Sequence, residues 1–218
     1  MFELKGNGRI YVVTNRHLIK QGNIYDVVEK CASKGAHGLF LREKDLSYDE
    51  LKEMAEGIKK ITDNYGIPLI VNGNFQVAKE IGAYGFHIGF NGFRSMISKG
   101  ELQMEIKKKD SFNNKEKYMS KIDSNSINNN IVGVSVHKLE EAVEAEKLGA
   151  DYLIAGHVFE TNCKPGLEGR GIGFIKEICQ NVSIPVIAIG GINHHNYKEI
   201  LLSGAHGVAI MSLAMSIV

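Results

Sequence analysis

Short apolar runs recur along the chain, and they alternate with segments whose apolar residues follow a helical period. Four runs are entered through Gly-Ala at the end of a helical pattern, and they contain GLFL, GFHIG, DYLIAG and GVAIM. The other four read IYVVT, IPLIVN, IVGVSV and IPVIAIGG, and Ile-Pro in two of them disfavours helix before the proline. Because these runs are short and almost wholly apolar, we predict eight buried parallel strands.

The intervening segments carry helix signals. Ser47 and Glu50 form a capping box ahead of an apolar stripe at helical spacing. The same spacing recurs over residues 23–33, 138–148 and 195–202. Glycine in the Gly-Ala pairs suits the left-handed position that closes a helix.

Strands and helices in this alternation predict a (β/α)8 TIM barrel, an α/β fold, as a single domain over residues 1–218. A doubly wound sheet is the alternative, but it gives no reason for two alternating kinds of strand entry. A Lys/Asn-rich insertion around 95–130 interrupts the rhythm. Its composition buries little apolar surface, so we predict a partly helical surface insertion, with a mobile lid as the alternative.

Composition narrows the class of protein. A net charge of +1 gives no electrostatic footprint for nucleic acid, so a small molecule is the expected partner. The three cysteines lie far apart, which indicates neither a disulfide framework nor a zinc site. The first residues lack the apolar run of a signal peptide, and no segment is long and apolar enough to span a membrane. We expect a soluble cytoplasmic protein without membrane contact.

Anion-binding residues follow three of the predicted strands, at the carboxyl ends where barrels bind ligands. Arg42 and Lys44 alternate after the second strand and suit an anionic substrate, with an exposed surface pair as the alternative. A phosphate cradle is predicted where barrels usually have one, after strands seven and eight. Its residues are Gly190, Gly191, Met211 and Ser212.

Histidines supply the candidate acid–base groups. His137 follows the fifth strand and precedes a helix. Histidine is the side chain best suited to move protons in both directions near neutral pH. A helix-capping or hydrogen-bonded histidine is the alternative, and Ser135 is predicted to orient the ring. His87 and His157 are each as well explained by structural roles. No spacing resembles HExxH, so no metal site is predicted.

Several motifs together resemble the thiamin phosphate synthase superfamily across nearly the whole chain outside the insertion. They are YVVTNR, LREKD, GVSVH followed by LEEA, GADYLIAGHVFET, and IPVIAIGGI followed by GAHGVAIMS. The segment GHVFETNCKPGLEGRG is especially similar to the TenI-type thiazole tautomerase of that superfamily. The resemblance implies a barrel, a thiazole phosphate ligand and a homodimer.

Departures from the synthase pattern favour the tautomerase. The synthase carries a magnesium-binding aspartate where this chain has Gly73, and a second one shortly after the fourth strand, where this chain has Asn91-Gly92. Without those carboxylates the charge of a pyrophosphate leaving group is not neutralised by metal. Phe40 also replaces a glutamine of the synthase pattern.

The resemblance therefore implies an isomerase that needs no cofactor or metal. It would aromatise the tautomer of 2-carboxy-4-methylthiazole ethyl phosphate by proton transfer, with His137 as the catalytic residue. Arg42 and Lys44 would hold the carboxylate, while the glycine cradle holds the phosphate. One alternative is a transferase, thiamin phosphate synthase (thiamin-phosphate pyrophosphorylase) with altered metal ligands. Another is a non-catalytic regulatory protein that binds thiamin intermediates.

Overall fold

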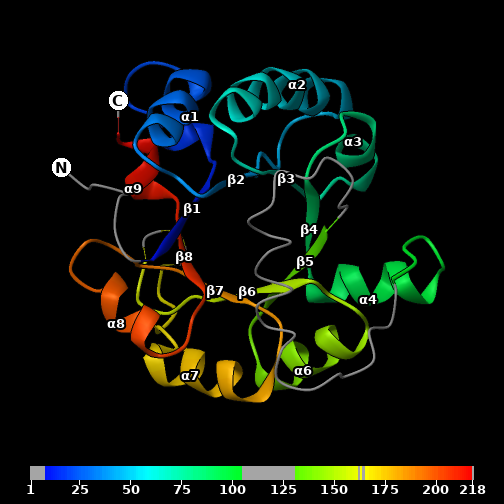
Figure 1. The fold of residues 1–218 in the computed structure, drawn as a ribbon, viewed down its shortest axis with the longest axis vertical. Coiled ribbons are helices and arrows are strands. Elements are labelled where there is room, and N and C mark those ends of the chain that lie inside the picture. Colours follow the sequence, from blue (N-terminus) through cyan, green and yellow to red (C-terminus); the bar gives the residue numbers. More distant parts are fainter. Residues whose placement is uncertain (1–7, 105–130, 162, 164, 218) are drawn as a thin grey trace. The chain divides into compact units, whose positions relative to one another are not determined.

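The computed structural model describes residues 8–104, 131–161, 163 and 165–217. Its eight strands follow one another around a closed sheet from β1 to β8, and every strand pair with a described register is parallel. This confirms the predicted (β/α)8 barrel (Figure 1). The strands are β1 (Arg9–Val13), β2 (Gly38–Leu41), β3 (Leu69–Asn72), β4 (Gly85–Gly89), β5 (Ile131–Val136), β6 (Tyr152–Gly156), β7 (Val186–Ile189) and β8 (Gly207–Ile210).

Helices follow the strands in chain order. A short 3-10 helix, η1 (Arg16–Leu18), comes first. The α-helices are α1 (Ile24–Ser33), α2 (Tyr48–Tyr65), α3 (Phe75–Glu80), α4 (Phe90–Ser98), α6 (Leu139–Lys147), α7 (Gly171–Asn181), α8 (Tyr197–Leu202) and α9 (Ser212–Met215). In the parts of the chain that the structure describes, none of them has the length and apolar character needed to cross a bilayer.

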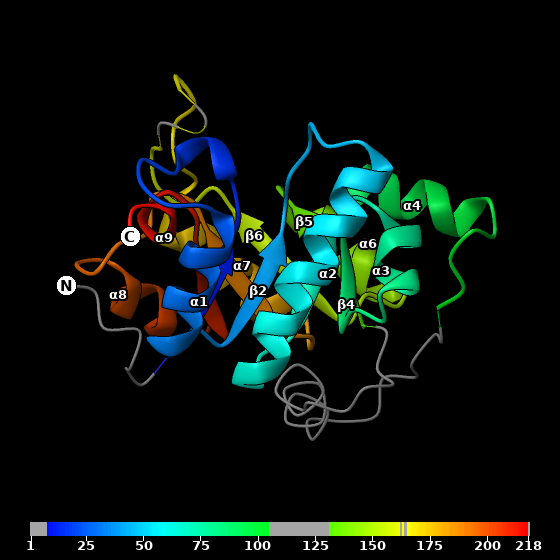
Figure 2. The ribbon, with the colours of Figure 1, turned by 90° about the horizontal axis from the view of Figure 1, so that it is seen from above.

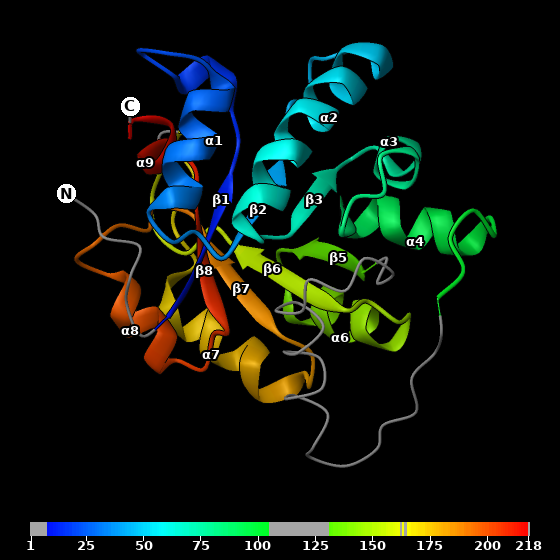
Figure 3. The same ribbon diagram turned by 45° about the horizontal axis from the view of Figure 1, so that its top comes forward.

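The described residues pack as two compact units. Unit 1 contains residues 8–87 and 209–217, and unit 2 contains the described residues from 88 to 208. In unit 1, α1 and α2 pack against each other, and α2 runs back beside the strands after the turn that follows β2 (Figure 2). In unit 2, β6 lies between β5 and β7 (Figure 3).

The Gly-Ala pairs end helices as their pattern predicts. All four glycines have positive φ, between 59° and 101°; they are Gly35, Gly82, Gly149 and Gly204. After α1 the amide of Ala36 donates to the carbonyl of Cys31, and the amide of His37 donates at 2.8 Å to Ile10 of β1. The connections after α3 and α6 repeat both bonds. The left-handed glycine therefore ends the helix and lets the next strand begin to pair with the preceding one.

Predicted helix boundaries hold within a few residues. The capping box of Ser47 and Glu50 begins α2, and Asn23 caps α1. The helix predicted over 195–202 begins later, at Tyr197, because the preceding residues form a turn in which Asn193 and Asn196 exchange hydrogen bonds. Of the insertion predicted around 95–130, residues 95–98 belong to α4, and residues 105–130 lie outside the described residues.

Strand side chains form the core, and they include the ionisable ring of His87. The strands are almost entirely buried, including the large rings of Tyr11, Phe40 and Tyr152. His87 of β4 is 2% exposed and meets the Phe40 ring edge to face at a centroid distance of 5.6 Å. Burial lowers the pKa of His87 to about 3, because the charged imidazolium loses its hydration there. The ring is therefore neutral at physiological pH, which disfavours an acid–base role.

This burial predicts a pH dependence of stability. The unfolded histidine binds a proton below its ordinary pKa of 6.5, whereas the folded one binds it only near pH 3. The stability that His87 contributes is thus complete above pH 6.5 and is lost as the pH falls through this window, by about 1.4 kcal/mol per pH unit. Urea unfolding of wild type and His87→Gln between pH 7.5 and 5 should reveal it. Parallel pH profiles for the two proteins would contradict the argument.

Candidate active site

Arg42 and Lys44 follow β2 in unit 1. Arg42 is half-buried and Lys44 is exposed. The amide of Arg42 donates to the hydroxyl of buried Thr14 at 2.9 Å, which ties the end of β2 to the end of β1. No carboxylate of the described residues pairs with either cationic side chain. Two uncompensated cations beside a strand end suit an anionic ligand, as the sequence predicts.

Glu43 lies between these two cations, and sequence reasoning does not single it out. Its carboxylate is buried, with a side chain 1% exposed, and it accepts from the amide of Arg16 at 3.1 and 3.2 Å and from Arg16 Nη1 at 3.0 Å. Arg16 also donates to both oxygens of Asp45, and this contact holds the pKa of Asp45 well below its usual range. The only signal in the sequence was the alternation of charge, which places an acid between two cations.

Met211 and Ser212 follow β8, also in unit 1. Met211 caps the four-residue helix α9, and Ser212 is its exposed first residue. A short helix therefore does begin after the eighth strand, as the predicted phosphate cradle requires. The contacts of phosphate with these two residues remain a prediction.

His137 lies directly after β5 in unit 2, and its ring is exposed. Nδ1 lies 2.8 Å from the carbonyl oxygen of Gly156, the last residue of β6, and the amide of His137 donates to Glu141 at 2.6 Å. Since a carbonyl only accepts, Nδ1 carries the hydrogen, and Nε2 of the neutral ring is the basic atom. Both partners were missed, because neither stands out before the strands are paired. The orienting role of Ser135 remains a prediction.

Gly190 and Gly191 follow β7 and pack against the chain that leaves β6. The amides of Val158 and Phe159 donate to the carbonyls of Ile189 and Gly190, so strand pairing continues past both ends. Both glycines have positive φ, 109° and 65°. The carbonyl of Gly191 accepts from the Asn196 side chain, whereas neither glycine amide donates a hydrogen bond among the described residues. Free amides in this turn fit the predicted anion cradle, which stays untested.

Close packing also requires glycine at both positions, and the sequence does not reveal this requirement. A Cβ at Gly190 would lie 2.4 Å from Cβ of His157, and one at Gly191 would lie 2.6 Å from the carbonyl oxygen of Glu160. His157 itself is 6% exposed, and its Nε2 lies 3.2 Å from the carbonyl of Leu167. His157 thus anchors the long loop that runs from β6 to α7 (Figure 2). These contacts favour the structural explanation for His157.

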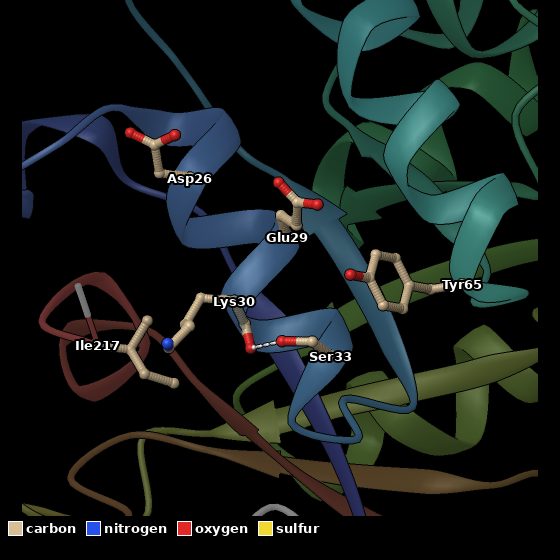
Figure 4. A pocket seen from close by; sticks show the side chains of 6 residues that line it. All are labelled: Asp26, Glu29, Lys30, Ser33, Tyr65 and Ile217. Atoms are coloured by element: carbon tan, nitrogen blue, oxygen red, sulfur yellow. Dashed lines mark hydrogen bonds between the residues drawn. The ribbon is translucent and has the colours of Figure 1, made fainter.

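A surface pocket of unit 1 has none of the predicted site residues in its lining. It is lined by Asp26, Glu29, Lys30, Ser33, Tyr65 and Ile217 (Figure 4). Two of its polar side chains serve the ends of α1: Asp26 completes the capping box, and the hydroxyl of Ser33 donates to the carbonyl of Lys30 at 3.0 Å. These contacts account for Asp26 and Ser33 without a ligand.

The packing around Gly191 generates a prediction about stability. Gly191→Ala should lower the free energy of unfolding by about 3 kcal/mol, because the new methyl overlaps the loop and the residue keeps a positive φ. Gly166→Ala is the matched control. Gly166 lies in the loop between β6 and α7 with φ 76°, and a Cβ added there would meet open space, so this substitution should cost about 1 kcal/mol. Urea denaturation measures both. Equal losses would remove the packing argument.

Comparisons with known proteins agree with the barrel. The sequence model of the family described as thiamine monophosphate synthase matches residues 10–96 and 116–214. Thiamine-phosphate synthase of Clostridium tetani is 36% identical over 203 residues, which cover 93% of this chain and 86% of the relative. The same enzyme of Clostridium acetobutylicum is 34% identical, with coverages of 95% and 87%.

A solved structure adds to this likeness. Thiamine phosphate pyrophosphorylase from Pyrococcus furiosus superimposes with a TM-score of 0.71 at 33% identity, covering 95% of this chain and 87% of that one. These relatives carry the name of the alternative activity, so they favour the synthase over the tautomerase. On the matches to its sequence model and its members, the chain belongs to the thiamine monophosphate synthase family of thiamin biosynthesis.

Proposed function

We propose that this chain is a thiazole tautomerase, which aromatises a thiazole phosphate carboxylate by moving one proton from ring C2 to an exocyclic carbon. The reaction has no net redox change, so it needs an acid–base group and anion anchors. His137 is the proposed acid–base group, and Arg42 and Lys44 are the proposed anchors for the carboxylate. Gly190, Gly191, Met211 and Ser212 remain the proposed phosphate contacts.

The proposal rests on two glycines that stand where the synthase pattern has carboxylates. Gly73 follows β3 with φ 86° and open space around its Cβ, and Gly92 lies in the first turn of α4. Within the described residues, no three His, Cys, Asp or Glu side chains gather as a metal site would need. Magnesium at a pyrophosphate is held mainly by carboxylates, so these residues do not fit the ion that the synthase uses.

His137 has the hydrogen bonding that such a proton transfer needs. Donation from Nδ1 to Gly156 leaves the Nε2 lone pair of the exposed ring to accept the proton from C2. The resulting imidazolium returns that proton from Nε2 to the exocyclic carbon, and the ring recovers its starting tautomer. The Gly156 carbonyl stabilises the imidazolium because its hydrogen bond from Nδ1 strengthens when the ring is charged.

Thiamin phosphate synthase is the second candidate. The names and coverage of the relatives favour it, since they match over nearly their whole length. Under this candidate, the ligands for the metal would have to differ from those of the synthase pattern.

One assay separates the tautomerase from the synthase. With the thiazole tautomer as substrate, purified protein should form the aromatic product at the same rate in EDTA as in magnesium, because no step uses a metal. With pyrimidine pyrophosphate, thiazole phosphate and magnesium, it should release no pyrophosphate. Isomerisation is followed by ultraviolet absorbance and pyrophosphate by a coupled assay. Magnesium-dependent condensation without isomerisation would replace the proposal with the second candidate.

The second prediction concerns His137. His137→Asn should lower kcat for isomerisation by about 10²- to 10⁴-fold, the usual contribution of general acid–base catalysis. Product affinity should change little, since the proposed anchors follow other strands. His195→Asn, an exposed histidine after β7, is the control and should keep wild-type turnover. Near-normal kcat in His137→Asn would reduce His137 to a structural contact.

A further inference from the structure

Arg16 follows β1 in unit 1, and it contacts two acids of the charged segment that follows β2, residues 42–45. Its guanidinium contacts Glu43 at 3.0 Å and Asp45 at 2.7 and 2.5 Å, and its amide donates to Glu43 as well. The two acids alternate along the chain with Arg42 and Lys44. Arg16 therefore binds both acids, and neither acid pairs with the two cations among the described residues.

We propose that Arg16 is a positioning residue, which occupies Glu43 and Asp45 so that Arg42 and Lys44 stay free for the anionic substrate. This inference rests on the proposed role of Arg42 and Lys44 as carboxylate anchors. Arg16 does not touch the substrate in this scheme. It acts on the charge and the geometry of the anchors.

Hydrogen bonds beyond the paired residues of β1 and β2 hold the backbone around Arg42. The amide of Thr14 donates to Phe40 at 3.0 Å, and the amide of Arg42 donates to the hydroxyl of Thr14. The Arg16 contacts with Glu43 extend this attachment beyond the end of each strand. A chain held on both sides of Arg42 fixes the backbone from which its side chain extends, which lowers the entropy lost on binding.

The electrostatic part concerns the two acids. Glu43 is buried, and a buried carboxylate without a partner is strongly unfavourable, so it needs a cation. Asp45 is half-exposed and is also within 3.0 Å of His17 Nε2. Without Arg16, the nearest cations along the chain are Arg42 and Lys44. We therefore expect the acids to neutralise the anchors when Arg16 is removed.

Two ligands that differ only in the carboxylate test the inference. Calorimetry gives the affinity of the full chain for the aromatic thiazole phosphate carboxylate and for the thiazole phosphate that lacks the carboxylate. Their ratio isolates the carboxylate contact from the phosphate contact. Arg16→Met should reduce this ratio by about tenfold, on the scale of one lost charge-assisted contact. Arg42→Met should reduce it similarly, because it removes an anchor directly.

A rescue variant separates charge competition from general damage. Arg16→Met/Glu43→Gln/Asp45→Asn removes both acids, so the ratio should return toward wild type. Lys52→Met is the matched control, since it breaks the Lys52–Glu80 pair at 2.8 Å on α2 and α3 of the same unit, and it should leave the ratio unchanged. If Arg16→Met does not fold, Arg16→Lys takes its place. It should give a smaller loss, because lysine keeps the charge but lacks the planar fork that bonds both acids.

The outcomes distinguish the inference from the function on which it rests. If wild type binds both ligands equally, the anchor role of Arg42 and Lys44 is wrong, and the inference falls with it. If wild type discriminates and Arg42→Met abolishes discrimination, but Arg16→Met does not, the inference alone is overturned. A loss in Arg16→Met that the triple variant fails to rescue also overturns the charge competition.

Discussion

The connection from helix to strand is the constraint on which the rest of this fold depends. Parallel strands cannot be joined by a tight hairpin. The chain must therefore leave each helix and enter a buried strand without leaving backbone N–H and C=O groups unpaired. A left-handed glycine, as at Gly35 or Gly149, lets the amides that follow it bond first to the helix and then to the preceding strand. The strands can then be short and largely apolar.

The chemistry gathers where this pairing runs out. Beyond β6 and β7 the backbone pairs for two more residues, and the glycine amides there have no hydrogen-bond partner in the described part of the chain. Beyond β5, His137 completes its hydrogen bonding with the carbonyl of Gly156. Arg42, His137 and the turn of Gly190 are thus held by contacts that continue the sheet, which is how a rigid scaffold positions groups on loops.

Two kinds of observation point to different activities within one family. Relatives at about a third identity carry the synthase name, whereas Gly73 and Gly92 stand where the synthase pattern has carboxylates. Overall identity reports the barrel fold, which by itself does not fix the activity. A change of two ligands alters the identity very little, whereas it changes the oxygen donors that are available to a divalent cation. The donor set is therefore the more direct guide to the chemistry of this chain.

The sequence by itself determined the barrel, the helix caps and the order of the candidate residues. Those features depend on local periodicity and on single residues such as Ser47 or Gly35, whose preferences act over a few neighbours. Only the tertiary structure decided the partners of those candidates. Glu43 with Arg16, and His137 with Gly156, are 27 and 19 residues apart, and pairing of neighbouring strands brings them into contact. The burial that keeps His87 neutral is likewise a property of the assembled core, which no local pattern encodes.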